Sequence, residues 1–159
     1  MQTTLIILKP DTVQRSLCGR IMSRFEDKGL QIVGLKMMKI SSQLAARHYE
    51  VHQGKPFYDQ LVSFMTAAPV LVMAIKGSDA IAVCRKMMGA TFGSNAESGT
   101  IRGDFGISNS LNLIHGSDGP DSAKMELSLF FSDNELFDDE RAIEPWVYAA
   151  KERGEGVER

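Results

Sequence analysis

The chain has 159 residues, of which 43% are apolar and 24% charged, with a formal net charge of −2 and a pI of about 5.9. This length suits one domain with its own core, so neither a disulfide framework nor a structural metal is needed for stability. The slightly acidic balance argues against nucleic acid as a primary partner, which requires a basic face. It still allows a locally basic pocket for a small anion.

Cysteine usage and the apolar runs bear on the compartment. Cys18 and Cys84 lie in apolar periodic segments outside any C-x-x-C pattern, so we expect free, buried thiols. The run Leu5–Leu8 is too short for a signal segment, and Ala67–Ile75 is too short to span a membrane. We therefore expect a cytoplasmic protein with no membrane partner.

The first elements in chain order are a strand and a helix. The apolar run Leu5–Lys9 ends at Pro10, as a buried strand would. Asp11 or Thr12 suits the N-cap of a following helix, and Gly29 suits its C′ position. Apolar side chains recur there at every fourth residue, at Val13, Leu17, Ile21 and Phe25.

The middle of the chain continues with a strand and two helices. Leu30–Ile40 is rich in β-type residues and partly alternates, which predicts a strand. Ser41 or Ser42 opens a helix that continues to about His52. Pro56 opens another, with apolar side chains at helical spacing at Phe57, Leu61, Phe64 and Met65.

A third strand, Pro69–Lys76, precedes a helix that starts at Ser78 or Asp79 and ends at Met88. The stretch Gly89–Gly106 is glycine-rich and lacks periodicity, and a loop of that length in a compact domain is usually functional or disordered.

The C-terminal part begins with a short strand, Leu111–His115, and a turn, Gly116–Gly119. Pro120 then suits the first position of a helix, and the charged tail Lys151–Arg159 is expected to be flexible or to lie against a neighbouring subunit. The alternation of strands and helices favours an α/β or α+β sandwich with helices over a four-stranded sheet. The strand order remains open.

Known phosphate-binding and metal-binding patterns are missing from the sequence. It contains no G-x-x-x-x-G-K-[ST], and no G-x-G-x-x-G follows a strand. The three histidines and two cysteines do not have the spacing of a zinc site. His48 and His52 are four residues apart, but we interpret them as surface or half-buried side chains, because such pairs have low specificity.

His115 is the strongest candidate for chemistry, because it stands at a strand end before a tight turn. From its position alone, a structural role is equally well supported. Glu126 falls on or beside the apolar face of the next helix, where a buried carboxylate needs a partner. An imidazole N–H would serve and would leave the other nitrogen free to attack. The alternative is that Glu126 reaches water at the rim.

Two cations have similar ambiguity. Arg102 lies between glycines, where it can approach an anion or simply pair with Asp104. Lys9 ends the first expected strand and is equally open to either role.

Together these segments resemble nucleoside diphosphate kinases over nearly the whole chain, from about Thr4 to Tyr148. The combination of N-x-x-H-G-S-D with G-T-I-R-G-D-F is highly specific. The segments that carry the resemblance are KPDTVQR (9–15), HY (48–49), PFYDQL (56–61), RKMMGAT (85–91), GTIRGDF (99–105) and NLIHGSDG (112–119).

The resemblance implies a ferredoxin-like βαββαβ fold with an antiparallel four-stranded sheet, in one domain spanning residues 1–159. It implies that His115 takes the γ-phosphate of a nucleoside triphosphate, mainly ATP, and passes it to a nucleoside diphosphate by a ping-pong mechanism, with broad base specificity. The phosphates or ribose would contact Lys9, Arg85, Thr91, Arg102 and Asn112, and the base would stack on Phe57. Tyr49, Ser117 and Glu126 would support the histidine.

It also implies Mg²⁺ held mainly by the substrate phosphates, with no protein metal ligand, and a homo-oligomer, with a hexamer favoured over a tetramer. The sequence departs from the family pattern at Thr12 and Ser16, where glycine is common, and in the proline-free loop 91–99. Two alternatives are a regulatory or scaffolding protein that binds nucleotide without turnover, and a transcription-linked nucleic-acid binder. The retained histidine and cations argue against the first, and the acidic balance against the second.

Overall fold

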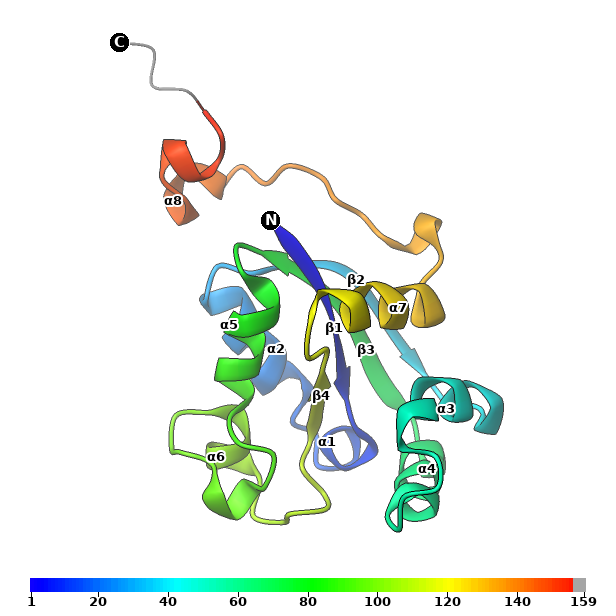
Figure 1. Ribbon diagram of the computed structural model, residues 1–159. Helices are drawn as coiled ribbons and strands as arrows, with labels where there is room; N and C mark the ends of the chain where they lie inside the picture. The colour runs from blue at the N-terminus through cyan, green and yellow to red at the C-terminus, as the bar shows by residue number, and fades with distance from the viewer. Residues whose placement is uncertain (156–159) are drawn as a thin grey trace.

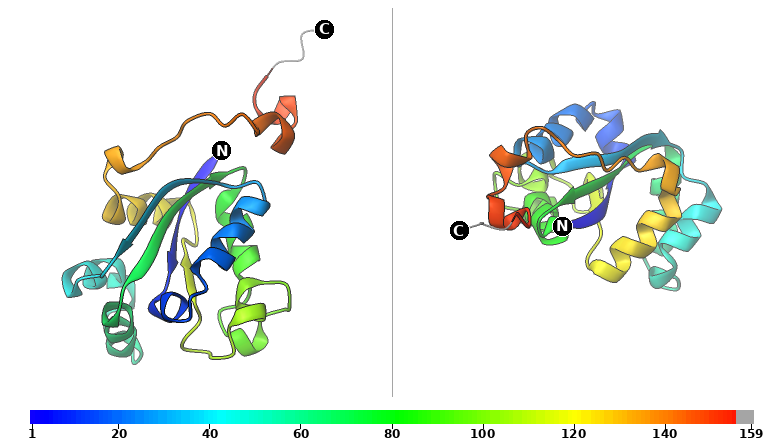
Figure 2. Two further views of the ribbon diagram at one scale, coloured as in Figure 1. Left: turned by 180° about the vertical axis from the view of Figure 1, so that it is seen from behind. Right: turned by 90° about the horizontal axis from the view of Figure 1, so that it is seen from above.

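The computed structural model describes residues 1–155 and contains a four-stranded sheet with helices on both faces (Figures 1 and 2). The strand order is β2-β3-β1-β4 and every neighbouring pair is antiparallel. This is the expected ferredoxin-like arrangement. The strands are β1 (Gln2–Leu8), β2 (Gln31–Met38), β3 (Val70–Gly77) and β4 (Ile114–Gly116). The helices are α1 (Pro10–Gln14), α2 (Cys18–Asp27), α3 (Ser42–His48), α4 (Tyr58–Ala67), α5 (Ala80–Met88), α6 (Ile101–Phe105), α7 (Pro120–Phe130) and α8 (Glu144–Val147).

Side-chain alternation along the strands builds a core on each face of the sheet. On β1, Ile6 and Leu8 face a cluster with Phe25 of α2 and Cys84 of α5. The intervening residues Leu5 and Ile7 belong to a second cluster with side chains of α3, α4 and α7. These helices lie together on one side of the sheet in the view from above (Figure 2). Because strand residues alternate between faces, the order of Ile114 and His115 on β4 decides which face receives each side chain. Ile114 belongs to the first core, so His115 points toward α3 and α7.

The single helix expected between the first two strands is in fact two helices. The chain turns between α1 and α2, where Ser16 has a φ of 56°. That left-handed conformation favours glycine and explains why glycine would suit this position. Asp11 and Thr12 are not caps either, since Lys9 is the N-cap residue of α1. Their side chains instead contact the backbone of Leu113.

The strand expected over Leu111–His115 is shorter and starts later. Leu113 has a φ of 72°, and the N–H of Ile114 donates to the carbonyl of Asn112 at 2.8 Å. A bond between residues two apart with a positive φ between them is a γ-turn of the rare, strained kind. The turn delays the start of β4 until Ile114.

The other expected elements are confirmed with small shifts at their ends. The helix expected to reach His52 stops at His48 and is followed by a 3₁₀ turn, and the helix expected from Pro56 begins at Tyr58. The glycine-rich stretch is not wholly irregular, because it contains α6 and a 3₁₀ turn at Gly93–Asn95.

After α7 the chain forms an extended arm that crosses one end of the sheet (Figure 1). Trp146, on this arm, is 90% exposed. The expected tail begins with a 3₁₀ turn at Ala150–Glu152, and its positions 156–159 lie outside the described residues. Both cysteines are free, with Cys84 buried and Cys18 half-buried. None of the helices in residues 1–155 is long and apolar enough to cross a membrane.

Candidate active site

The γ-turn brings two side chains of the N-x-x-H segment into one pocket. Residues three apart on a regular strand face opposite sides of a sheet. Asn112 and His115 nevertheless line the same cavity, of about 630 Å³, because the turn at Leu113 interrupts the alternation. A cavity of this size is in the range of small-molecule sites. The backbone of Leu113 is held from α1, since its carbonyl accepts from the Thr12 hydroxyl at 2.6 Å and its N–H donates to Asp11 at 3.1 Å.

His115 is oriented by a buried carboxylate on the next helix. Nε2 of His115 lies 3.1 Å from both carboxylate oxygens of Glu126, and Ser117 donates to the same carboxylate at 2.6 Å. Burial alone would raise the pKa of Glu126, but the hydrogen bond and charge of His115 and the Ser117 hydroxyl outweigh it and lower that pKa. Glu126 is therefore not a rim residue. With Nε2–H directed at the carboxylate, the imidazole has its lone pair on Nδ1.

Three cations surround the inner part of the pocket. Nζ of Lys9 donates to Oδ1 of Asn112 at 2.7 Å, and Nδ2 of Asn112 donates to the carbonyl of Thr91 at 3.0 Å. Burial, reinforced by the Arg102 charge and opposed by Asp11, lowers the pKa of Lys9 to about 8.

Arg102 donates to the carbonyls of Gly89, Asn112 and Ile114 rather than pairing with Asp104, which is bound by Arg24 instead. Burial and the nearby Arg85 lower the pKa of Arg102 to about 10.

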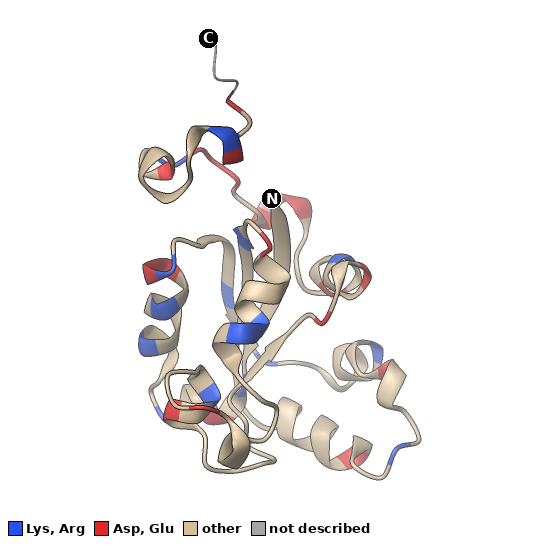
Figure 3. Cartoon of the chain, turned by 60° about the vertical axis from the view of Figure 1, so that its left-hand side comes forward, with Lys and Arg blue, Asp and Glu red and all other residues tan. Residues whose placement is uncertain are grey.

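Arg85 reaches the pocket from α5 and donates to the carbonyl of Gly116 at 3.2 Å. A Cβ at Gly116 would lie 2.7 Å from Sδ of Met88, so glycine lets α5 approach β4 closely. Within the described chain, none of the residues that line the pocket carries a carboxylate. The lining of the pocket therefore presents cationic side chains and no anionic ones, which suits a polyanionic ligand. Charges of both signs are interspersed over the rest of the ribbon (Figure 3).

Apolar side chains of α4 and its neighbourhood also line the pocket. Phe57, at the start of α4, is 47% exposed at the mouth and lies edge-on to His52 with ring centroids 5.4 Å apart. Sequence reasoning placed Phe57 here but missed the rest of the wall. Leu61 and Phe64 of α4 have the helical spacing that core side chains also have, and Leu111 was expected in a strand, so none of the three was singled out as lining a pocket.

The other three expected residues lie on the inner wall or behind it. Tyr49 lines the cavity and is buried, and burial with the Glu126 charge raises the pKa of its hydroxyl. Ser117 and Glu126 lie behind His115 and are not among the lining residues. Eight of the ten site residues expected from the sequence thus line one cavity, and the other two hold its histidine.

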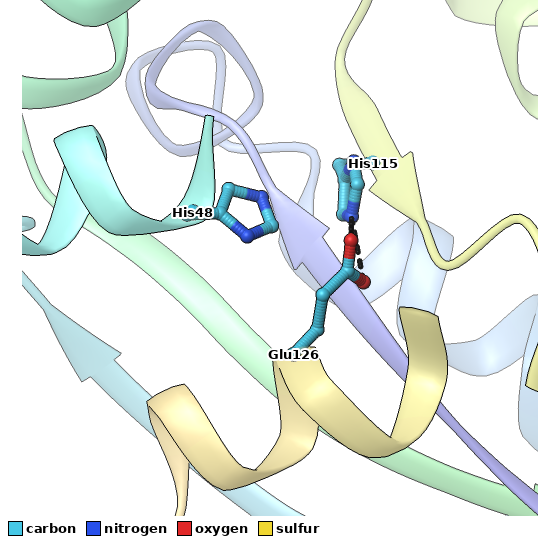
Figure 4. A group of neighbouring side chains, drawn as sticks. All are labelled: His48, His115 and Glu126. Carbon is cyan, nitrogen blue, oxygen red and sulfur yellow. Dashed lines mark hydrogen bonds and ion pairs between the residues drawn. The ribbon is translucent and has the colours of Figure 1, made fainter. Parts of the chain in front are cut away.

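His48 is where the sequence interpretation was wrong. It is neither a surface nor a half-buried residue, since it is only 7% exposed, and its ring packs edge-on against His115 with centroids 4.8 Å apart. Burial, then the charge of His115, lowers the pKa of His48 to about 3, so the ring is neutral at physiological pH. The fold gathers ligand atoms of His48, His115 and Glu126 within 4.8 Å of one another, although no sequence spacing indicated a metal-binding cluster (Figure 4).

Comparison with known proteins shows the family of the chain. A family model described as nucleoside diphosphate kinase matches residues 2–136. A nucleoside diphosphate kinase of Microcystis aeruginosa is 58% identical over 147 residues, which is 92% of this chain and 99% of the relative. One of Bacillus licheniformis is 51% identical over 148 residues, 93% of this chain and 100% of the relative.

A solved structure is similarly close. The halophilic nucleoside diphosphate kinase of Halobacterium salinarum in complex with CDP has 49% sequence identity and a TM-score of 0.90, and the match covers 92% of this chain and 98% of that one. The chain belongs to the nucleoside diphosphate kinase family.

Proposed function

We propose that the chain carries out its nucleoside diphosphate kinase reaction in two half-reactions, with His115 as the covalent carrier. In the first, the Nδ1 lone pair attacks the γ-phosphorus of a nucleoside triphosphate. The N–P bond forms while the bond to the β–γ bridging oxygen breaks, and the diphosphate leaves with that oxygen. In the second, a terminal oxygen of another nucleoside diphosphate attacks the same phosphorus, and Nδ1 regains its lone pair.

The observation that carries this proposal is the hydrogen bond between Nε2 of His115 and Glu126 at the base of a cationic pocket. Attack by Nδ1 leaves positive charge on the ring, and the adjacent carboxylate stabilises that charge without moving. Ser117 holds the carboxylate from its other side at 2.6 Å. A site this complete supports turnover rather than a purely regulatory role.

Nucleotide recognition is proposed to divide between the two parts of the pocket. Lys9 and Arg85 would contact phosphate oxygens. Arg102 has five N–H donors, of which three are used on backbone carbonyls, so two remain for a phosphate. Thr91 and Asn112 would contact phosphate or ribose oxygens. Phe57 would stack on the base, which any base permits, so specificity for the base should be broad.

The cavity also fits the expected use of Mg²⁺. Among the described residues that line it, amide and hydroxyl groups are present but no carboxylate is. The ion would therefore be held mainly by the substrate phosphates, where it neutralises charge that builds up during transfer. ATP is the expected main donor, and other nucleoside di- and triphosphates are the expected substrates.

We further propose that residues 1–159 form one domain that assembles as a homohexamer, with a tetramer as the alternative. The support is apolar surface that a single copy leaves uncovered, at Leu35 and Met37 on the edge strand β2, Ile107 before β4, and Trp146 on the arm. Light scattering would decide, since a hexamer has six times the chain mass of 17.5 kDa. A cytoplasmic location remains a prediction from the sequence.

The mechanism is tested by following the phosphoryl group. The protein is incubated with γ-labelled ATP and magnesium, and we expect acid-labile, base-stable label on the protein. A chase with unlabelled GDP should move the label to GTP. His115→Asn should take up no label, while Cys18→Ser, which changes a residue outside the pocket, should label normally. Absence of label on the wild type, or normal labelling of His115→Asn, would overturn the mechanism.

A further inference from the structure

We propose that His48, His115 and Glu126 form a binding site for a zinc-type transition-metal ion, and that metal bound there blocks the uptake of phosphate by His115. The three side chains come from α3, β4 and α7 and converge behind the nucleotide pocket (Figure 4). The proposal of metal binding does not depend on the proposed function. The inhibition rests on the role proposed for His115.

The first support is that His48 is buried without a hydrogen-bond partner. Its side chain is directed at His115 and Glu126, and neither ring nitrogen has a partner within residues 1–155. Buried polar groups are almost always paired, so an imidazole unpaired at both nitrogens calls for an explanation. A metal ion would satisfy one of them, and binding would cost His48 no existing hydrogen bond.

The second support is the spacing of the donor atoms. Ligands about 2.0 to 2.2 Å from a tetrahedral zinc ion are about 3.3 Å apart. Nε2 of His115 and the oxygens of Glu126 are already 3.1 Å apart. The ligand atoms of the three residues all lie within 4.8 Å of one another. Since His115 and Glu126 are already close enough, His48 is the residue that must move inward, by rotation about its side-chain bonds. Oε2 of Glu126 can keep the Ser117 hydroxyl while Oε1 turns to the metal.

The donor set selects the kind of metal. Two neutral imidazoles and one carboxylate suit zinc and its neighbours in the first transition row, whereas magnesium prefers oxygen ligands in an octahedral array. Three protein ligands leave a fourth tetrahedral position for water. His115 is half-buried and lines the cavity, so the ion can enter through the nucleotide pocket.

The proposed inhibition follows from which nitrogen the metal takes. A metal on Nε2 of His115 replaces the proton that this nitrogen donates to Glu126, and the neutral ring then carries its proton on Nδ1. Nδ1 no longer has a free lone pair, so it cannot form the N–P bond. The negative charge of Glu126 is also used on the metal rather than on the developing imidazolium.

Binding is tested on the nucleotide-free, full-length protein. Zn²⁺ affinity is measured by competition with a chromogenic chelator, and Co²⁺ by its visible absorption, which reports tetrahedral nitrogen and oxygen ligation. We expect one ion per chain, with affinity at least tenfold lower in His48→Gln, His115→Asn and Glu126→Gln. His52→Gln and Cys18→Ser should bind as the wild type does, because neither belongs to the cluster. His52 is the matched control for His48.

Several outcomes would overturn the site. They are undiminished Zn²⁺ affinity in a folded His115→Asn protein, an equal loss in His52→Gln, or a loss in Cys18→Ser alone. Thermal unfolding establishes which variants are folded, and His115→Asn decides the matter where His48→Gln does not fold.

The inhibition is tested by phosphoenzyme formation after incubation with Zn²⁺, with and without a chelator. Each variant is compared with its own metal-free value. The wild type should lose label and regain it with the chelator, while His48→Gln should be at least tenfold less sensitive. Equal sensitivity in both proteins would overturn the inhibition. A protein that binds zinc but never forms phosphoenzyme would retain the metal site and refute the mechanism instead.

Discussion

Nε2 of His115 lies 3.1 Å from both oxygens of the Glu126 carboxylate. The carboxylate is fixed in turn by Ser117, whose hydroxyl donates at 2.6 Å and whose backbone N–H donates to Leu5 on β1 at 3.1 Å. The histidine on β4, its partner on α7 and the central strand of the sheet are thus joined by short contacts. This chain of contacts holds Nδ1 in place while the pocket exchanges one nucleotide for another.

Replacing Glu126 by Gln should lower kcat by roughly 10- to 100-fold with little change in KM. The amide retains the shape but not the charge that stabilises the ring during transfer, and small errors in orientation are costly. Steady-state kinetics with ATP and GDP would measure this. Glu97→Gln, an exposed position outside the pocket, is the charge-matched control. A proportionate rise in KM with unchanged kcat would contradict the assigned role.

The lowered pKa of Lys9 predicts a loss of activity in alkali. Lys9 binds phosphate only in its charged form, which is present below its pKa of about 8 and is lost as the pH rises through that value. We expect kcat/KM to fall about tenfold per pH unit above that point. In the pH profile of kcat the alkaline fall should begin at a higher pH, because bound phosphate raises the pKa of Lys9. Lys9→Arg should shift the alkaline fall to higher pH, whereas Lys36→Arg, which changes a surface pair with Glu135, should leave it in place. If the fall stays at the same pH in Lys9→Arg, it is caused by the titration of another group.

Phe57→Ala should raise KM for every nucleotide. Stacking of a base on an aromatic ring is worth about 1 to 3 kcal/mol, which corresponds to roughly 5- to 150-fold. The increase should be similar for ADP, GDP and CDP, since each offers a π-face. Phe57→Trp should behave nearly as the wild type, and Phe57→Leu tests whether apolar contact suffices. A large effect on one base alone would argue against stacking as the source of broad specificity.

Thr12 departs from the family pattern and has a specific contact in this chain. Its hydroxyl donates to the carbonyl of Leu113, the centre of the γ-turn, at 2.6 Å. Thr12→Val should lower the free energy of unfolding by about 1 kcal/mol and kcat several-fold, because a buried hydrogen bond is lost where the backbone is strained.

The control for Thr12 is Thr66→Val, which removes a similar hydroxyl-to-carbonyl bond in α4, to Val62 at 2.8 Å. Its stability should fall but its kcat should not. Thr12→Ser should retain both properties. Equal kcat in Thr12→Val and the wild type would show that the γ-turn does not depend on the hydrogen bond from Thr12.

Much of the fold was predictable because apolar periodicity and turn residues agreed. Gly29, for example, follows α2 with a φ of 93°, as its place after an apolar stripe indicated. The break between α1 and α2 was not predictable, because the four-residue stripe continues through it. Only the positive φ of Ser16, which serine adopts under tertiary constraint, reveals it.

The site was predictable where residue types carry the chemistry and unpredictable where burial does. His115 before a turn and Arg102 between glycines were each ambiguous alone, and they became specific through their place among the other segments that resemble the family. The position of His48 was not predictable, since none of its sequence neighbours indicates that its ring is buried against His115 on β4. The apolar wall beyond Phe57 has the same difficulty, because a side chain that faces a ligand and one that faces the core have the same periodicity.

The γ-turn at Leu113 also bears on which changes of chain length the protein tolerates. A strand places a side chain on one face or the other by counting residues, and one residue more or less reverses the result. Loss of the turn, or of one residue within 112–115, would send the imidazole toward α2 and α5, away from Glu126. The loop 91–99 has no such parity to keep, since it enters the pocket from outside the sheet. Among relatives, insertions and deletions should therefore accumulate in the loop 91–99 and be absent between Asn112 and His115.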